Sequence, residues 1–193
     1  GDFLYTRSEF DVMKNDIRLC KYLVFGGVVI GLLLPDGCID KARTKELVAL
    51  AAPLEVTFHR AFDRCNDPIK GLHDIIETGC KRILTSGQVP SAPDALDLLQ
   101  TLVHEAGDNI IIMPGSGVRG NNIATIKTVT KAKEAASRRE VVSMYPSQDV
   151  SDRPFRQAVS ASNQAQTPGG RAYSIIVGSS LLPLWEKVAR SAG

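Results

Sequence analysis

Short apolar runs alternate with amphipathic stretches along the first 144 residues of the chain. The runs are rich in Val, Ile and Leu, which predicts strands buried on both faces, and they occupy 28–33, 54–59, 82–86, 109–114 and 140–144. The stretches between them repeat apolar residues at spacings of three and four, which predicts helices at 10–22, 40–51, 67–79, 93–106 and 121–133. Asp40 and Asp67 are the expected N-caps of two of these helices, and Gly79 is an expected C-cap.

Strands that alternate with helices, without hairpin signals, predict parallel βαβ units and an α/β fold. Four or five units are expected, whereas a closed (β/α) barrel needs eight, so the pattern leaves open a doubly wound sheet and part of a TIM-like barrel. The pattern ends near residue 144. Residues 145–170 are rich in Gln, Ser, Pro and Asp and predict a flexible polar segment. The tail at 171–193 holds an apolar run at 173–182 and a short predicted helix at 184–192.

Composition and charge narrow the range of partners. The 193 residues carry 23 basic and 21 acidic side chains and a formal net charge of +2, which gives no reason to expect nucleic acid or an anionic membrane. No two of the four cysteines have the spacing of a zinc site or a redox CxxC motif, so we expect reduced, intracellular thiols that pack in the interior. Because the first residue is not Met, the chain is expected to be processed, tagged or a fragment, and a fragment is the favoured interpretation.

Polar residues suited to chemistry follow three of the predicted strands. Because the carboxyl ends of parallel strands meet at one edge of a sheet, we expect these segments to lie together and to line a ligand-binding cavity. They are His59, Arg60 and Asp63 after the strand at 54–59, Thr85, Ser86 and Gly87 after 82–86, and Gly115, Ser116 and Gly117 after 109–114.

Each segment supports more than one interpretation. His59 is suited to a general base or a metal ligand, Arg60 to an anion clamp and Asp63 to orienting either; the alternative is a buried polar network that holds the strand ends together. The hydroxyls at 85–86 can bind ligand oxygens or cap the next helix. The glycines at 115 and 117 free backbone N–H groups for an anion, or serve only the steric needs of a tight loop. The sequence has no nucleophile elbow and no P-loop, so catalytic residues stay unassigned.

The same segments resemble the CutC family of copper-homeostasis proteins. The resemblance covers residues 1–125 and rests on five motifs in the same order, of which the most distinctive reads Phe58-His59-Arg60-Ala61-Phe62-Asp63. The other motifs lie at 1–5 with 13–17, at 27–37, at 82–87 and at 113–117. The resemblance implies a TIM-like barrel, incomplete here with about five of eight strand–helix units. It also implies a cytoplasmic protein of intracellular copper handling, with the nucleus as the alternative compartment.

This sequence departs from the family pattern in two places. Family members carry three further strands before the motif at 1–5, and those strands hold cysteines associated with copper binding. The strand after the last motif carries a His-x-Ser arrangement in the family, whereas 140–144 reads Glu-Val-Val-Ser-Met here. A truncated or alternatively spliced product would account for both departures. The resemblance then implies weak Cu(I) binding by this chain, because soft Cu(I) prefers thiolates and the four present are scattered.

Three functional readings follow. The first is copper homeostasis, with copper as the bound ion. The second is a barrel enzyme that acts on a small anionic or phosphorylated metabolite, with the loop from Gly115 to Gly117 holding the anion and His59 as acid or base. The third is a fragment without independent activity. In that case the open edge at 28–33 is expected to cause aggregation or a homo-oligomer, unless the apolar run at 173–182 folds back to cover it.

Overall fold

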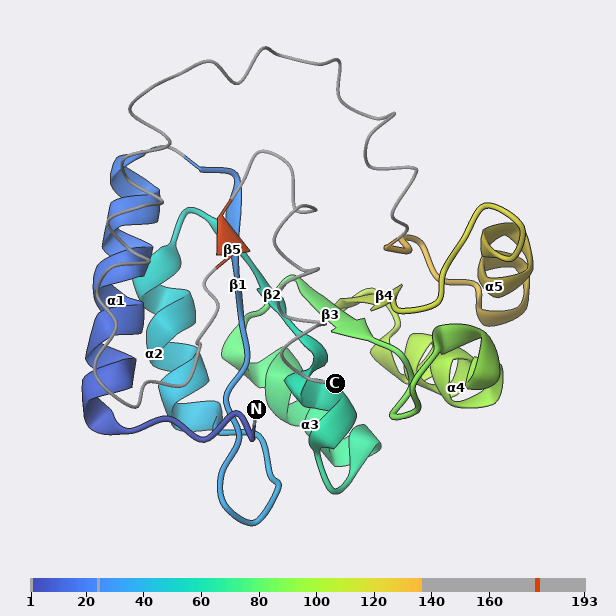
Figure 1. Cartoon of the computed structure of the whole chain (residues 1–193), viewed down its shortest axis with the longest axis horizontal. Helices are drawn as coiled ribbons and strands as arrows, with labels where there is room; N and C mark the ends of the chain where they lie inside the picture. The colour runs from blue at the N-terminus through green and yellow to red at the C-terminus, as the bar shows by residue number, and fades with distance from the viewer. Residues whose placement is uncertain (1, 24, 137–175, 178–193) are drawn as a thin grey trace.

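The protein folds as a parallel sheet with helices following its strands (Figure 1). The structure, a computed structural model, describes residues 2–23, 25–136 and 176–177. The strands are β1 (Gly27–Ile30), β2 (Glu55–Phe58), β3 (Arg82–Thr85), β4 (Ile111–Pro114) and β5 (Ile176–Val177). The helices are α1 (Arg7–Tyr22), α2 (Lys41–Ala51), α3 (Pro68–Thr78), α4 (Leu96–Ala106) and α5 (Ile123–Thr130), with 3-10 turns η1 (Arg60–Arg64) and η2 (Ala92–Asp94). The predicted α/β class is therefore confirmed.

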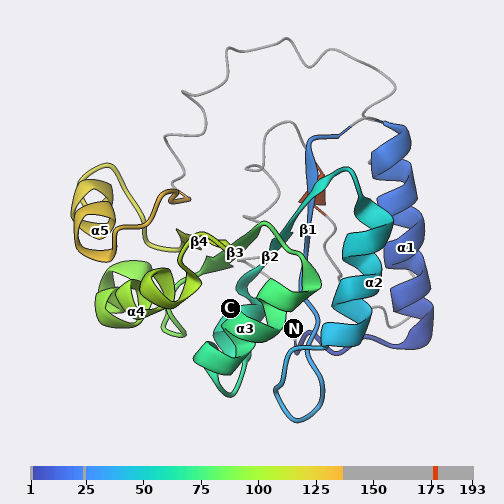
Figure 2. The ribbon, with the colours of Figure 1, turned by 180° about the vertical axis from the view of Figure 1, so that it is seen from behind.

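Strand order identifies the kind of sheet. The order is β4-β3-β2-β1-β5, and the first four strands are parallel, so consecutive βα units lie side by side without the reversal that defines a doubly wound sheet. Each helix from α1 to α4 contacts the next one along the chain, which makes one continuous helical layer (Figures 1 and 2). This is the arrangement of a barrel wall, and in the described residues the wall is an open arc.

The apolar core between the sheet and this helical layer holds the strands in place. Alternate strand residues share one buried cluster with leucines from α2, α3 and α4. They are Val28, Ile30, Val56, Phe58, Ile83 and Ile112 from the strands and Leu47, Leu72 and Leu99 from the helices. Burying a side chain of this size contributes about 1.5–3 kcal/mol to the stability of the fold. The core therefore fixes the positions of the strand ends and of the polar residues that follow them.

Local signals in the sequence account for most helix boundaries. Asp40 and Asp67 accept hydrogen bonds from backbone N–H groups of the first turns of α2 and α3, and Gly79 ends α3 in a left-handed conformation, as predicted. The predicted helix at 93–106 begins later, at Leu96, because η2 precedes it. The predicted helix at 121–133 ends at Thr130, where Lys131 turns left-handed. The predicted strand at 140–144, flexible segment at 145–170 and helix at 184–192 lie outside the described residues.

The edge of β1 is paired by a segment from the far end of the chain. Val28 lies opposite Val177 and Val29 opposite Ile176, in an antiparallel arrangement. The sequence left two outcomes open for this edge, association with another chain or pairing by the apolar run at 173–182. The described residues of that run pair with β1. The ribbon places β5 beside β1 in both views (Figures 1 and 2).

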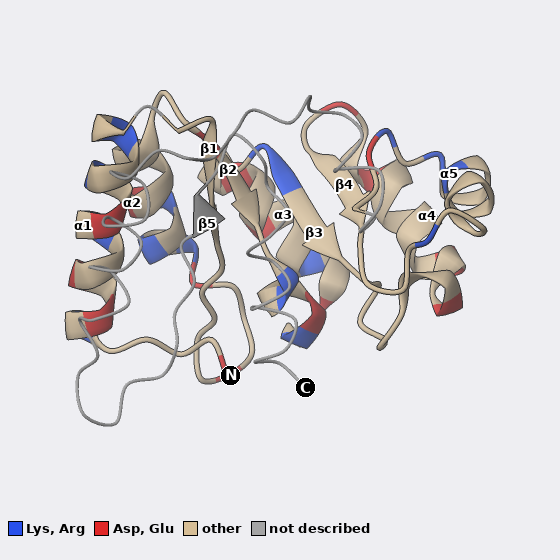
Figure 3. Ribbon diagram, turned by 45° about the horizontal axis from the view of Figure 1, so that its top comes forward, with Lys and Arg blue, Asp and Glu red and all other residues tan. Residues whose placement is uncertain are grey.

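Charge is mixed over the helices. Figure 3 shows basic and acidic positions interspersed along α1 and α3, in keeping with the net charge of +2. None of the described helices combines the length and the apolar character that crossing a membrane requires.

Candidate functional site

Asp63, in the turn that follows β2, is the hub of a polar network between two strand ends. Its carboxylate accepts hydrogen bonds from Arg60 Nε at 2.7 Å, from the backbone N–H of Ser86 at 3.0 Å and from the hydroxyl of Thr85. The backbone N–H of Gln88 lies 3.3 Å away. The side chain is 6% exposed. The end of β2 is therefore tied to the end of β3 through one buried carboxylate.

Arg60 is held in one orientation by this network. Nε bonds Asp63, and Nη2 donates to Ser86 Oγ at 2.9 Å. The side chain is 20% exposed, and no described residue accepts a hydrogen bond from Nη1. A guanidinium fixed on one side and open on the other is suited to a carboxylate or phosphate ligand, because its N–H groups form a planar fork.

Thr85, Ser86 and Gly87 use their polar groups within the protein. The hydroxyl of Thr85 accepts a hydrogen bond from Gly87 N–H at 2.9 Å in addition to its bond with Asp63. The hydroxyl of Ser86 lies in hydrogen-bonding contact with both Asp63 and the carbonyl of Val89. These hydroxyls therefore organise the loop after β3. They do not cap the next helix, because α4 begins without a side-chain cap.

His59 is enclosed directly before this network. It is 2% exposed, its Nδ1 accepts a hydrogen bond from Ala61 N–H at 3.0 Å, and the centre of the Phe3 ring lies 5.1 Å from its own. Burial lowers the pKa of His59 to about 4, with smaller upward contributions from backbone hydrogen bonding and from the Asp63 charge. The imidazole is therefore neutral at physiological pH.

The loop from Gly115 to Gly117 lies beside the end of β3. Gly115 N–H donates to the carbonyl of Thr85 at 2.8 Å, and the Ser116 hydroxyl donates to the carbonyl of Pro90 at 2.8 Å. Gly117 has a φ of +69°, and a Cβ there would lie 1.9 Å from Ser91 Oγ. The left-handed backbone therefore favours glycine at position 117, and the bonds at Gly115 and Ser116 are made within the protein.

The structure brings the three predicted segments together as a chain of contacts. The first two meet at Asp63, and the third joins the second through Thr85. Sequence reasoning missed Gln88 and Phe3. Gln88 is a left-handed residue, with φ of +62°, in a loop that showed no motif of its own. Phe3 comes from the other end of the chain, and only its place in the motif at 1–5 could have suggested a link with His59.

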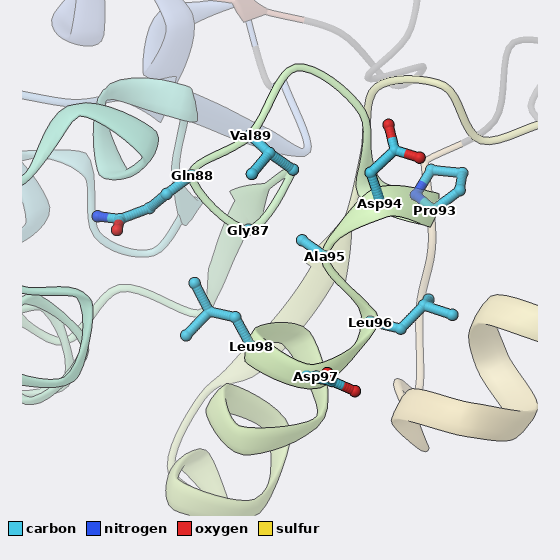
Figure 4. A pocket seen from close by; sticks show the side chains of 9 residues that line it. All are labelled: Gly87, Gln88, Val89, Pro93, Asp94, Ala95, Leu96, Asp97 and Leu98. Atoms are coloured by element: carbon cyan, nitrogen blue, oxygen red, sulfur yellow. The ribbon is translucent and has the colours of Figure 1, made fainter.

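A surface hollow of about 550 Å³ lies next to this network, at the start of α4 (Figure 4). Among the predicted site residues it is lined by Gly87, and its other walls come from residues 88–89 and 93–98. Its ionisable lining residues are Asp94 and Asp97, both exposed. Two carboxylates make this hollow a poor site for an anion, so the open side of Arg60 is the better candidate.

The cysteines are poorly suited to holding copper as they stand. All four are free thiols, and Cys20, Cys65 and Cys80 are buried. Burial raises the pKa of Cys20 to about 12 and the pKa values of Cys65 and Cys80 to about 11, so these three remain protonated near neutral pH. In the part of the chain that the structure describes, no three His, Cys, Asp or Glu side chains are grouped so that they could hold a metal ion.

Comparison with known proteins finds CutC proteins. The chain is 48% identical over 145 residues to a family protein CutC of Chromobacterium violaceum, covering 74% of this chain and 59% of the relative. It is 53% identical over 134 residues to a family protein CutC of Parabacteroides distasonis, covering 69% of this chain and 55% of the relative. The chain therefore spans less than two thirds of the length of these relatives.

A solved structure gives the same result for the fold. The CutC protein of Streptococcus agalactiae, which is named for copper homeostasis, superposes with a TM-score of 0.67 at 29% identity. The match covers 70% of this chain and 66% of that protein. That protein is a TIM-like barrel, and the described sheet of this chain is an open part of such a barrel. The CutC family model matches residues 1–140, which include the whole Asp63 network, and the chain belongs to the CutC family.

Proposed function

We propose that this chain is a copper homeostasis protein of the CutC type that binds copper and handles it inside the cell. The observation that carries the proposal is the family match over residues 1–140, together with a structural relative named for copper homeostasis. Four free thiols favour the cytoplasm as its compartment, with the nucleus as the alternative, because both keep cysteines reduced. Copper is here the cargo of the protein.

Cu(I) titration against a chromophoric chelator tests this proposal. We expect measurable but weak Cu(I) binding near neutral pH, because Cu(I) prefers thiolates and burial keeps three of the thiols protonated. Binding should strengthen as the pH rises toward the raised pKa values, since the thiolate fraction then increases. Cys38→Ser, at the one cysteine that is not fully buried, should weaken it more than the buried Cys80→Ser.

Two results would contradict these expectations in different ways. If Cu(I) is not retained at any pH, the chain does not bind copper and the copper proposal is wrong. If a tight, stoichiometric complex is lost with one Cys→Ser change, the chain has a complete copper site and the expected weakness is wrong.

A second function is favoured by the geometry of Arg60: binding of a small anionic ligand. Asp63 and Ser86 fix the guanidinium from one side while Nη1 stays open, so a carboxylate or phosphate could be bound without reorganising the side chain. This support for anion binding comes from the contacts of Arg60 alone and does not depend on copper. The two functions therefore have separate tests.

Arg60→Lys is expected to weaken binding of inorganic phosphate about tenfold or more, because hydrogen bonds to charged groups contribute about 1.5–3 kcal/mol and Lys lacks the planar fork. The measurement is the phosphate-dependent shift in melting temperature of the full chain. Arg18→Lys, at an exposed arginine on α1, is the matched control and should leave the shift unchanged. Equal shifts in both variants would show that phosphate binds elsewhere.

A further inference from the structure

The ring of His59 is confined on several sides. A Cβ built on Gly31 would lie 2.4 Å from Nδ1 and 2.5 Å from Cε1, so the neighbouring backbone lies close against that edge of the ring. The rings of Phe3 and Phe58 lie 5.1 and 6.2 Å away, centre to centre. With 2% of the residue exposed, the imidazole has no room to turn. Its two nitrogens therefore keep distinct surroundings.

The backbone decides which nitrogen carries the proton. Ala61 N–H points at Nδ1 over 3.0 Å, and a backbone N–H can only donate, so Nδ1 must be the accepting, unprotonated nitrogen. A neutral imidazole has one N–H, which then lies on Nε2. A proton on Nδ1 would place two hydrogens between Nδ1 and the backbone of Ala61.

The charge state follows from the surroundings. Desolvation is the largest influence on the pKa of His59, and it lowers the value to about 4. Asp63 is the charged group that acts on the ring, and its upward effect on the pKa is smaller than the lowering by desolvation. The phenylalanines and Gly31 contribute no charge. At pH 7 the ring is therefore neutral as well as fixed.

These constraints remove two of the roles that the residue type allows. A protonated Nε2 has no lone pair for a metal ion and cannot take a proton from a substrate, while Nδ1 is already occupied. We infer that His59 is a fixed neutral donor, through Nε2–H, to an oxygen atom of a bound ligand, and that it serves neither as a metal ligand nor as a general base. The ligand half of this inference rests on the anion-binding function proposed above. No described residue accepts a hydrogen bond from Nε2.

Nitrogen-15 NMR of the three histidines of the full, ligand-free chain tests the tautomer. We expect His59 to show a protonated Nε2 and an unprotonated Nδ1 that do not change between about pH 5.5 and 8, because burial lowers its pKa from the ordinary value of about 6.5 to about 4. His73 and His104 are exposed and give the comparison signals from the same sample. His59→Gln assigns the signals by removing one set. A proton on Nδ1, or a change in the protonation of His59 between about pH 5.5 and 8, would overturn the inference.

Additions of metal ions and of phosphate test whether His59 binds a metal and whether its Nε2–H donates to a bound ligand. Zn²⁺ or Cu(I) should leave the His59 resonances in place, and a metal-dependent change at Nε2 would overturn the donor role. Inorganic phosphate should shift the Nε2–H proton signal in the wild-type chain. If phosphate raises the melting temperature through Arg60 but leaves His59 unchanged, the ligand half is wrong and anion binding stands. If phosphate affects neither readout, both the ligand half and the proposed anion binding are wrong.

Discussion

Asp63→Ala is expected to lower the free energy of unfolding by about 3–5 kcal/mol, because removing one partner of a buried ion pair leaves the other charge and several donors without an acceptor. Asp63 is 6% exposed and accepts from the side chain of Arg60, the hydroxyl of Thr85 and the backbone of Ser86. Urea denaturation of both chains at pH 7 measures the difference.

The matched control is an aspartate that forms an ion pair on the surface. Asp108 pairs with Lys133, but its side chain is 96% exposed, so Asp108→Ala should leave the free energy of unfolding almost unchanged. A loss below about 1 kcal/mol in Asp63→Ala would show that water replaces the carboxylate. The buried polar network that holds the strand ends together would then not be a stabilising feature.

Asp63→Ala also concerns the relation between the two interpretations of the residues after β2, a ligand site and a structural network. Sequence reasoning presented a ligand site and a structural network as alternatives for His59, Arg60 and Asp63. In the structure Asp63 uses its oxygens within the protein, whereas Nη1 of Arg60 donates to no residue that the structure describes. The network orients the guanidinium of Arg60. The two interpretations are therefore compatible, because the structural network holds in place the side chain that would bind a ligand.

The secondary structure was largely predictable because it depends on local patterns. Apolar runs and spacings of three and four gave the four parallel strands and the five helices, and Asp40, Asp67 and Gly79 marked boundaries through their own hydrogen bonds and backbone angles. The choice between a barrel wall and a doubly wound sheet was not predictable in this way. Periodicity shows that a helix has a buried face but not which face of the sheet it covers, and the strand order was needed.

The segments of the candidate site could be chosen from the sequence, but the contacts among their residues could not be predicted. Strand ends drew attention to all three segments, since parallel strands bring their carboxyl ends together. The role of His59 depends on Gly31 and Phe3, which are remote in sequence and restrict the ring, and on a backbone N–H that no side-chain pattern reveals. The hydroxyls of Thr85 and Ser86 were expected to bind a ligand or to cap α4. In the structure they bind Asp63, a contact that only the approach of β2 to β3 makes possible.

Removal of residues 171–193 is expected to convert a monomeric chain into a dimer or larger aggregates. In the full chain, β5 pairs with Val28 and Val29 of β1, and a strand edge without a partner presents backbone N–H and C=O groups to which another chain can add. Size-exclusion chromatography with light scattering, over a range of protein concentrations, measures the mass of each form.

A chain that ends at residue 182 is the control, because it is also shortened but keeps Ile176–Val177. It should stay monomeric at concentrations where the chain ending at 170 associates. Association should depend on concentration, since a second molecule supplies the missing neighbour of β1. If both truncated chains remain monodisperse, the edge of β1 is protected by something other than β5. If the full chain already associates, two residues of pairing are too few to protect a four-residue edge strand.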